Sequence, residues 1–384
     1  MKKYVALVLC LIIFAGCSSG GEGGTATANA DVLTQAAASE NTQTAAQTGE
    51  SAEAQTEAGA QSSAQTEAAT EANAQTSAQT EAATEANAQT EQETDIPSSG
   101  EEEIAEEEQI DLDSIYSILA LSDHNTPEGF DKKNDETTYG ELTEVEYYSN
   151  TTEANRKCYV FTPPGYDPEI TYPVLYLLHG IGGIHSEWLG GNPDVVLSNL
   201  IASGEAKPMV VVIPNVRAMK DDGYPKEVFG QENIAAFGNF INDLRNDLMP
   251  FISENYSVSD KRSETAIAGL SMGGKESLFI GVSMPETFGY VGAFSPAPGL
   301  LAVPEMNFPG QVTAEEMTFT DKYNDNTFML IINGNQDGVV GDIPLTYHEA
   351  FDANNVRHAY YTIDGGHDFT VWKNGLYYFA KSIF

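Results

Sequence analysis

The 384-residue sequence is poor in cysteine and in basic residues. Of its three cysteines, Cys10 and Cys17 fall within an N-terminal export signal, so the folded part keeps only Cys158 and an internal disulfide is excluded there. The chain has 18 Lys and Arg against 57 Asp and Glu, and no basic residue between Lys3 and Lys132. Its formal net charge of −39 argues against nucleic acid or an anionic membrane face as a partner. Because the folded part has no internal disulfide, its stability must come from a packed core.

Metal-binding motifs are missing as well. The sequence contains neither an H-E-x-x-H motif nor a closely spaced pair of cysteines in its folded part. We therefore predict no metal and no cofactor. Nothing in the sequence indicates an obligate protein partner.

The N-terminus has the pattern of an export signal. Lys2 and Lys3 precede an apolar run over 4–15, which is long enough for a signal-peptide core and too short to span a bilayer as a helix. The run ends in Phe14-Ala15-Gly16-Cys17, which resembles a bacterial lipobox. Residues 1–17 are thus predicted to be a lipoprotein signal peptide, with Cys17 lipidated and the protein held outside the cytoplasm at the membrane or cell surface. Ordinary secretion with cleavage nearby is the alternative.

Residues 18–108 are rich in Ala, Thr, Gln, Ser, Glu and Gly, and the ten residues AQTEAATEAN at 64–73 recur unchanged at 78–87. Such a segment has too little apolar surface to offset the entropy of an unfolded chain. It is predicted to be a disordered acidic spacer.

The remaining sequence indicates one α/β domain over 141–384, preceded by an extension over 109–140 to which no fold is assigned. Short apolar strands alternate with helical stretches, and the most continuous apolar runs are typical of parallel strands covered on both faces. The predicted strands are 142–149, 155–162, 173–179, 209–214, 265–269, 289–294, 327–333 and 356–363. The predicted helices are 193–203, 235–255, 273–284, 344–354 and 370–382. The fold class expected is an eight-stranded, mostly parallel sheet with helices on both faces.

A G-x-S-x-G motif carries the first functional indication. Gly269-Leu270-Ser271-Met272-Gly273 follows a predicted strand and precedes a predicted helix. The glycines permit a tight strand-to-helix turn that lifts the serine hydroxyl clear of the sheet, at a helix N-terminus that favours a developing anion. Ser271 is therefore the predicted nucleophile.

A serine nucleophile needs a general base, and in the α/β-hydrolase arrangement the acid and then the histidine follow the serine. Three histidines do so. His348 lies within a predicted helix and His358 within or beside a strand, so both are expected to be surface or packing residues. His367 follows the last predicted strand, where a loop residue can reach the serine turn, and is the predicted base.

Asp337 is the predicted acid because it comes just after the seventh predicted strand. Asp342, five residues later, is the competing candidate. Asp364 and Asp368 lie too close in sequence to His367 to be its usual partner.

Two backbone N–H donors are expected to stabilise an oxyanion. One is that of Met272, directly after the nucleophile. The other should come from the glycine-rich loop after the third strand, where Ile181 is preferred and Gly182 is the alternative. His179, at the start of that loop, is expected to fix it by side-chain hydrogen bonds rather than to act as a second base.

Three long strings place the chain among known sequences: TPPGYDPEITYPVLYLLHGIGGIHSEW at 162–188, ENYSVSDKRSETAIAGLSMGG at 254–274 and GGHDFTVWKNGLYYF at 365–379. From about residue 142 onward the chain resembles the feruloyl and acetylxylan esterases of carbohydrate esterase family one, such as the esterase domain of xylanase Z, in the α/β-hydrolase superfamily. The resemblance implies Ser271, Asp337 and His367 as nucleophile, acid and base. The Pro-rich stretch within 296–326 has no match in this family and is expected to shape the acyl pocket.

The favoured hypothesis is a lipid-anchored serine esterase that removes ferulate from arabinoxylan on plant cell walls, with Trp188, Phe294 and Trp372 contacting the acyl group or sugar. These aromatic residues are as readily core residues. A second hypothesis is deacetylation of xylan, or hydrolysis of another carbohydrate or siderophore ester. A third is a non-catalytic, carbohydrate-binding surface protein.

Overall fold

The chain divides into two units, and the second covers residues 98–384. The computed structural model describes residues 109–384 except residue 307. The predicted signal peptide (1–17) and spacer (18–108) lie outside the described residues. Within the described part, no helix combines the length and the apolar character needed to cross a membrane.

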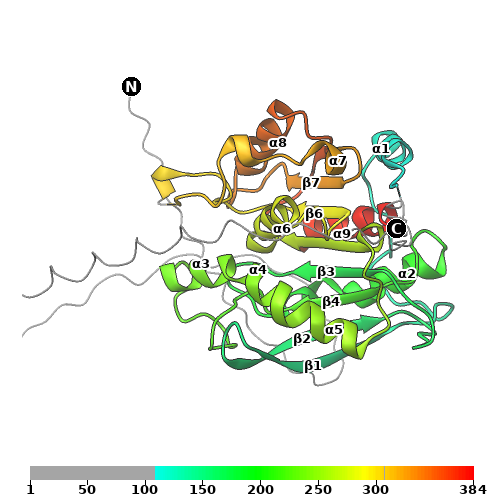
Figure 1. The fold of residues 1–384 in the computed structure, drawn as a ribbon. Coiled ribbons are helices and arrows are strands. Elements are labelled where there is room, and N and C mark those ends of the chain that lie inside the picture. Colours follow the sequence, from blue (N-terminus) through cyan, green and yellow to red (C-terminus); the bar gives the residue numbers. More distant parts are fainter. Residues whose placement is uncertain (1–108, 307) are drawn as a thin grey trace, which may run out of the picture. The chain divides into compact units, whose positions relative to one another are not determined.

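A single eight-stranded sheet forms the centre of this unit, in the order β1-β2-β4-β3-β5-β6-β7-β8 (Figure 1). The strands are β1 (Glu141–Ser149), β2 (Ala154–Thr162), β3 (Val174–Leu178), β4 (Val210–Pro214), β5 (Thr265–Leu270), β6 (Tyr290–Phe294), β7 (Phe328–Gly334) and β8 (Ala359–Ile363). The strands from β4 to β8 in this order are parallel, whereas β1 and β2 add an antiparallel edge. The predicted fold class is confirmed, and each predicted strand end lies within three residues of the observed one.

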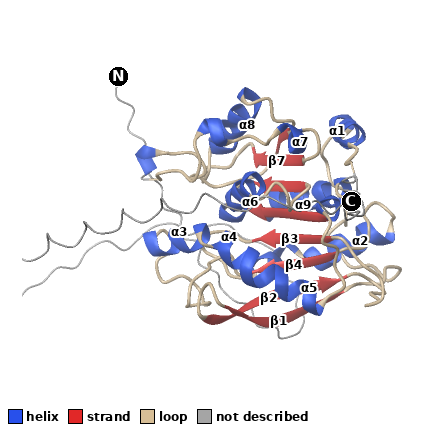
Figure 2. Ribbon diagram, in the orientation of Figure 1, coloured by secondary structure: helices blue, strands red, loops and turns tan. Residues whose placement is uncertain are grey.

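Helices cover both faces of the sheet (Figure 2). One face carries α1 (Leu112–Leu121), α2 (Pro193–Ala202) and α9 (Phe369–Ser382), and the other carries α3 (Gln231–Gly238), α4 (Phe240–Asp243), α5 (Met249–Asn255), α6 (Met272–Ser283) and α8 (Ile343–Ala353). A short α7 (Asp321–Asn324) precedes β7. The side chains of β3 alternate between the two cores: Tyr176 packs with the second set of helices, and Leu175 and Leu177 pack with the first. Burial on both faces explains the uninterrupted apolar strands.

The long helix predicted over 235–255 is wrong as a single element. The first helical part, α3, begins at Gln231 and ends at Gly238. The next residue, Asn239, donates a side-chain hydrogen bond from Nδ2 to Ala218 O at 2.9 Å. A wider, π-type turn over Leu244–Leu248 then leads into α5. Pro250, in the first turn of α5, has no N–H to donate and crowds the preceding turn, which accounts for the widening.

The extension over 109–140, which had no assigned fold, packs on the domain. Its helix α1 buries Leu112 and Leu119 in the same core as α9. Tyr116 accepts a hydrogen bond from the N–H of Met329 in β7 at 3.1 Å. The extension therefore belongs to the folded unit.

The segment 296–326 begins beside the serine turn. The N–H of Ala297 donates to Ser271 O at 3.0 Å. Further along, Gln311 bonds the buried ion pair of Lys275 and Glu276 in α6, with 3.0 Å to each partner. The segment is thus fixed to the helix that starts at the serine, and its predicted influence on an acyl pocket stays a prediction.

Candidate active site

Ser271 occupies the turn between β5 and α6, with φ 51° and ψ −118°. This positive φ is strained for a residue with a side chain, and such strain is typical of functional turns. The neighbouring glycines make the turn sterically feasible: a Cβ on Gly273 would lie 2.5 Å from His179 O, and one on Gly269 would lie 2.5 Å from the carbonyl carbon of Gly273. The G-x-S-x-G motif therefore packs directly against the loop after β3.

His367 and Asp337 reach this turn from the ends of two neighbouring parallel strands. The Nε2 atom of His367 lies 2.9 Å from Ser271 Oγ, and its Nδ1 atom lies 2.8 Å from Asp337 Oδ2. Since a carboxylate only accepts, Nδ1–H donates to Asp337 and leaves the Nε2 lone pair to accept the serine proton. The structure thus brings together the three residues that the sequence analysis selected.

Asp337 is held as a carboxylate. Burial raises its pKa, but the hydrogen bond and charge of His367 and the N–H groups of Val339 and Val340 outweigh that effect, so the pKa lies below its ordinary value. The competing Asp342 is exposed at the start of α8. Asp337 therefore has the position and charge state of an orienting acid.

The other two acids have separate hydrogen-bond partners. Asp364 accepts from the side chain of Asn335 at 2.5 Å. Asp368 caps α9 by accepting from the N–H of Thr370 at 2.7 Å. The hydrogen bonds of these two carboxylates therefore do not involve His367.

Backbone donors surround the serine. Met272 is the first residue of α6, so its N–H has no acceptor within the helix. In the loop after β3, a Cβ on Gly180 would lie 3.3 Å from Ser271 Cβ. Among the described residues, the N–H groups of Met272, Ile181 and Gly182 have no hydrogen-bond acceptor. Both loop residues thus stay candidates for the second oxyanion donor.

Glu187 supports this loop, and the sequence analysis did not single it out. Its Oε2 accepts from the N–H of Gly180 at 2.6 Å. Burial raises its pKa, opposed by that N–H and by the charge of His367. The sequence signals Glu187 only through its place directly before the buried Trp188.

His179 holds the other side of the loop. Its Nε2 accepts from the N–H of Val216 at 2.8 Å, so Nδ1 carries the proton and donates to Gly180 O at 2.7 Å. Burial lowers its pKa to about 4, which keeps the ring neutral. Both ring nitrogens are therefore occupied in holding backbone.

Comparison with known proteins shows the family to which the chain belongs. The family model named Esterase matches residues 149–332. The ferulic acid esterase of carbohydrate esterase family one from the anaerobic fungus Anaeromyces mucronatus is 34% identical, with a TM-score of 0.64 over 68% of this chain and 96% of that protein. The chain belongs to carbohydrate esterase family one. It is thus a member of a family of carboxylic ester hydrolases in the α/β-hydrolase superfamily.

More distant similarities set the limits of this assignment. An endo-1,4-beta-xylanase/feruloyl esterase of Xylanibacter ruminicola is 28% identical over 261 residues, which are 64% of this chain and 32% of that protein. This chain therefore spans about a third of the length of that relative. The feruloyl esterase module of Clostridium thermocellum, at 17% identity and a TM-score of 0.54, shows the fold alone.

Two of the three aromatic residues predicted to contact substrate are core residues, and that prediction is wrong for them. Trp188 is fully buried and donates its Nε1–H to Leu178 O at 2.8 Å. Phe294 is also fully buried, between Trp188 and Phe379. Trp372 differs, because its ring packs edge-on to His367 with 5.1 Å between centroids. Substrate contact by Trp372 stays a prediction.

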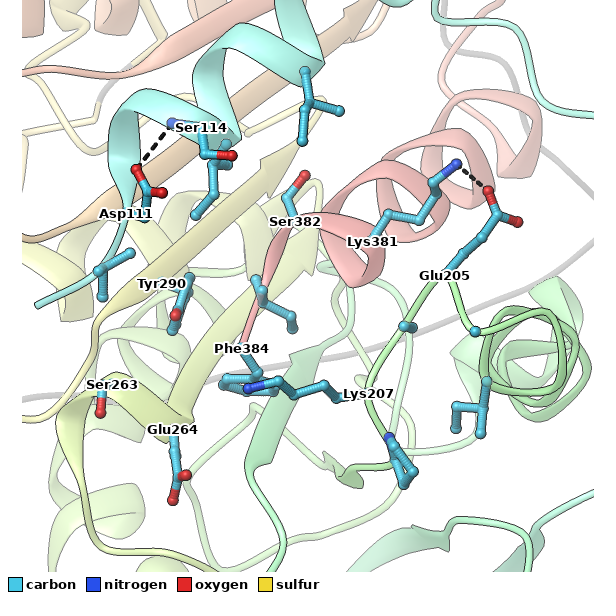
Figure 3. A pocket seen from close by; sticks show the side chains of 18 of the residues that line it. Asp111, Ser114, Glu205, Lys207, Ser263, Glu264, Tyr290, Lys381, Ser382 and Phe384 are labelled. Atoms are coloured by element: carbon cyan, nitrogen blue, oxygen red, sulfur yellow. Dashed lines mark hydrogen bonds and ion pairs between the residues drawn. The ribbon is translucent and has the colours of Figure 1, made fainter. Parts of the chain in front are cut away.

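Figure 3 shows a cavity of about 680 Å³, and Ser271 is not among the residues that line it. Its walls include Glu264 and Tyr290, at the starts of β5 and β6, and the ion pair between Lys381 and Glu205 at 2.5 Å. Open α/β sheets bind ligands at the carboxyl ends of their strands, which is where Ser271 lies. The candidate active site therefore lies at the serine edge of the sheet, and this cavity lies outside it.

Proposed function

We propose that this chain is a cell-surface serine esterase that removes acyl groups from plant cell-wall polysaccharide, chiefly ferulate esterified to arabinoxylan. The observation that carries the proposal is the hydrogen-bonded series of Ser271, His367 and Asp337, beside N–H groups that have no acceptor among the described residues. Membership of family one and the similarity to a fungal ferulic acid esterase support the choice of acyl group.

In the proposed reaction, Ser271 Oγ attacks the ester carbonyl carbon while His367 Nε2 takes the hydroxyl proton. The carbonyl oxygen becomes an oxyanion, which the N–H of Met272 and that of Ile181 or Gly182 stabilise. When the ester bond breaks, His367 gives the proton to the leaving sugar oxygen, which departs as a hydroxyl, and an acyl-enzyme remains. Water then attacks in the same way, and ferulate is released. Asp337 keeps the proton of His367 on Nδ1 throughout.

The substrate is tested with methyl ferulate, an acetyl ester and acetylated xylan, using wild type and Ser271→Ala. We expect a preference for ferulate and a loss of about 10³-fold or more in kcat in the variant. Preference for acetyl groups would replace ferulate by acetyl in the proposal. Absence of turnover of any ester by folded wild type would reject catalysis and leave carbohydrate binding.

The cell-surface part of the proposal rests on the lipobox at Cys17. It is tested separately, by expressing the full chain and Cys17→Ser in a bacterium. We expect the wild type in the membrane fraction, partitioning into detergent, and the variant in the soluble or secreted fraction. Equal distribution of the two would reject the lipid anchor and leave the esterase proposal unaffected.

A further inference from the structure

Two histidines and an aspartate meet between α8 and the start of β8, outside the active site. His348 and Asp352 are four residues apart on the helix and so lie on the same face. His358 directly precedes β8. One ligand atom from each of the three side chains lies within 4.8 Å of the others. The group matches no short metal-binding motif, because its members come from a helix and from the segment that follows it.

A hydrogen bond to the backbone fixes the orientation of the His358 ring. Its Nδ1 lies 2.8 Å from Val356 O, and a carbonyl oxygen only accepts, so Nδ1 carries the proton. The Nε2 lone pair therefore points away from the backbone, toward His348 Nδ1 at 2.7 Å. A backbone carbonyl on the second ring nitrogen is the usual way in which proteins orient a ligating histidine.

The facing ring nitrogens lie at hydrogen-bonding distance. Two lone pairs at 2.7 Å would repel, so either a proton or a metal ion must lie between His348 and His358. Asp352 stands beside them, with Oδ1 at 4.0 Å from His358 Nε2. We propose that His348, Asp352 and His358 bind a divalent transition-metal ion, with Zn²⁺ the best match to two imidazoles and a carboxylate.

Binding requires only a small movement. Two nitrogens bound to tetrahedral zinc at about 2.05 Å are about 3.4 Å apart, so the rings must separate by about 0.7 Å. The side chain of His358 is 1% exposed and is fixed, whereas those of His348 and Asp352 are 28% and 63% exposed and can adjust. Three protein ligands leave a fourth position for water.

The site would act on stability and not on the ester. The proposed metal site lies at the start of β8, a strand of five residues that is about 16 Å long. His367 lies beyond the other end of this strand. Asp337 lies before α8 and His367 lies after β8, so a metal ion would join the two elements next to these residues. We expect bound metal to slow thermal inactivation and to leave the initial rate at 25 °C unchanged.

The test uses the full chain without a histidine tag, stripped with a chelator, and titrated with Zn²⁺ in excess Mg²⁺ that occupies carboxylates elsewhere. We expect one zinc site per chain, and a rise in unfolding midpoint of about 5 °C or more at 100-fold excess over Kd. His348→Ala and Asp352→Asn should weaken binding at least tenfold. Glu349→Gln, which removes an exposed carboxylate from the same helix, should bind as wild type does.

Bound Co²⁺ provides a direct check on the ligands. Its visible absorption should indicate nitrogen ligation in the wild type and should disappear in His348→Ala. The proposal is overturned if Zn²⁺ binds equally to wild type and His348→Ala, or if no saturable site exists below 1 mM metal, since the two rings would then share only a proton.

Discussion

Replacing Glu187 tests how the loop after β3 is held in place for catalysis. Its carboxylate accepts the Gly180 N–H at 2.6 Å, next to the proposed second oxyanion donor. A hydrogen bond to a charged acceptor contributes about 1.5–3 kcal/mol, and 1.4 kcal/mol corresponds to a factor of ten in rate. If the oxyanion requires the whole of this contribution, Glu187→Ala lowers kcat about 10- to 150-fold. Glu187→Gln keeps a neutral acceptor of about half the strength and lowers kcat about 3- to 12-fold.

Stability separates this positioning role from a structural one. Burial raises the pKa of Glu187. At pH values above the ordinary pKa, the ionised side chain therefore destabilises the folded state, and this destabilisation decreases as the pH falls. Glu187→Gln is therefore expected to unfold at the wild-type temperature or higher at pH 7, while its kcat falls and its KM changes little.

The assay compares kcat, KM and thermal unfolding for wild type, both Glu187 variants and the control Glu286→Ala, which removes an exposed carboxylate after α6. A Glu187→Ala variant with kcat within twofold of wild type would refute the reasoning. A fall in kcat fully explained by unfolding would refute it as well.

Four further outcomes are expected. Asp337→Asn should lower kcat by about 10³ to 10⁴ with little change in KM, measured on methyl ferulate, because His367 loses the acceptor that fixes its tautomer. The pKa of Asp337 is lowered in the folded state, so its carboxylate stabilises the fold above its unfolded pKa of roughly 3.9, and this stabilisation is lost as the pH falls through the folded pKa. The unfolding temperature of Asp337→Asn should therefore decline less between pH 4 and pH 2 than that of the wild type. Cys158 is fully buried with a pKa raised to about 12, so a thiol reagent should label it only in denaturant, and labelling of the native protein at that site would contradict its burial. Phe294→Ala should destabilise the fold by about 3–5 kcal/mol in urea unfolding, because it empties a core site between Trp188 and Phe379.

The sheet and the serine, histidine and aspartate cluster were predictable because each depends on local pattern. Apolar runs such as that of β3 mark buried parallel strands, and the glycines around Ser271 are required by backbone contacts as close as 2.5 Å. His367 and Asp337 were identified by their positions just after strands, since parallel strands bring their carboxyl ends to one edge.

Features that depend on tertiary contact were not predictable in the same way. Trp188 and Phe294 lie near the active-site segments in sequence, but their side chains are buried in the core that the sheet shares with α2 and α9. Glu187 acquires its role from a loop that folds back on it. The break at Gly238 and Asn239 did have a local signal, because both are common where helices end, but the apolar pattern continued through it.

The central claim is that Ser271 carries the acyl group during ester hydrolysis. The most direct test is mass spectrometry of wild type quenched within one turnover of 4-nitrophenyl ferulate, followed by proteolysis. The account predicts a feruloyl group on the peptide that contains Ser271, and none in Ser271→Ala. Turnover with no acylated peptide, or acylation of another residue, would contradict it.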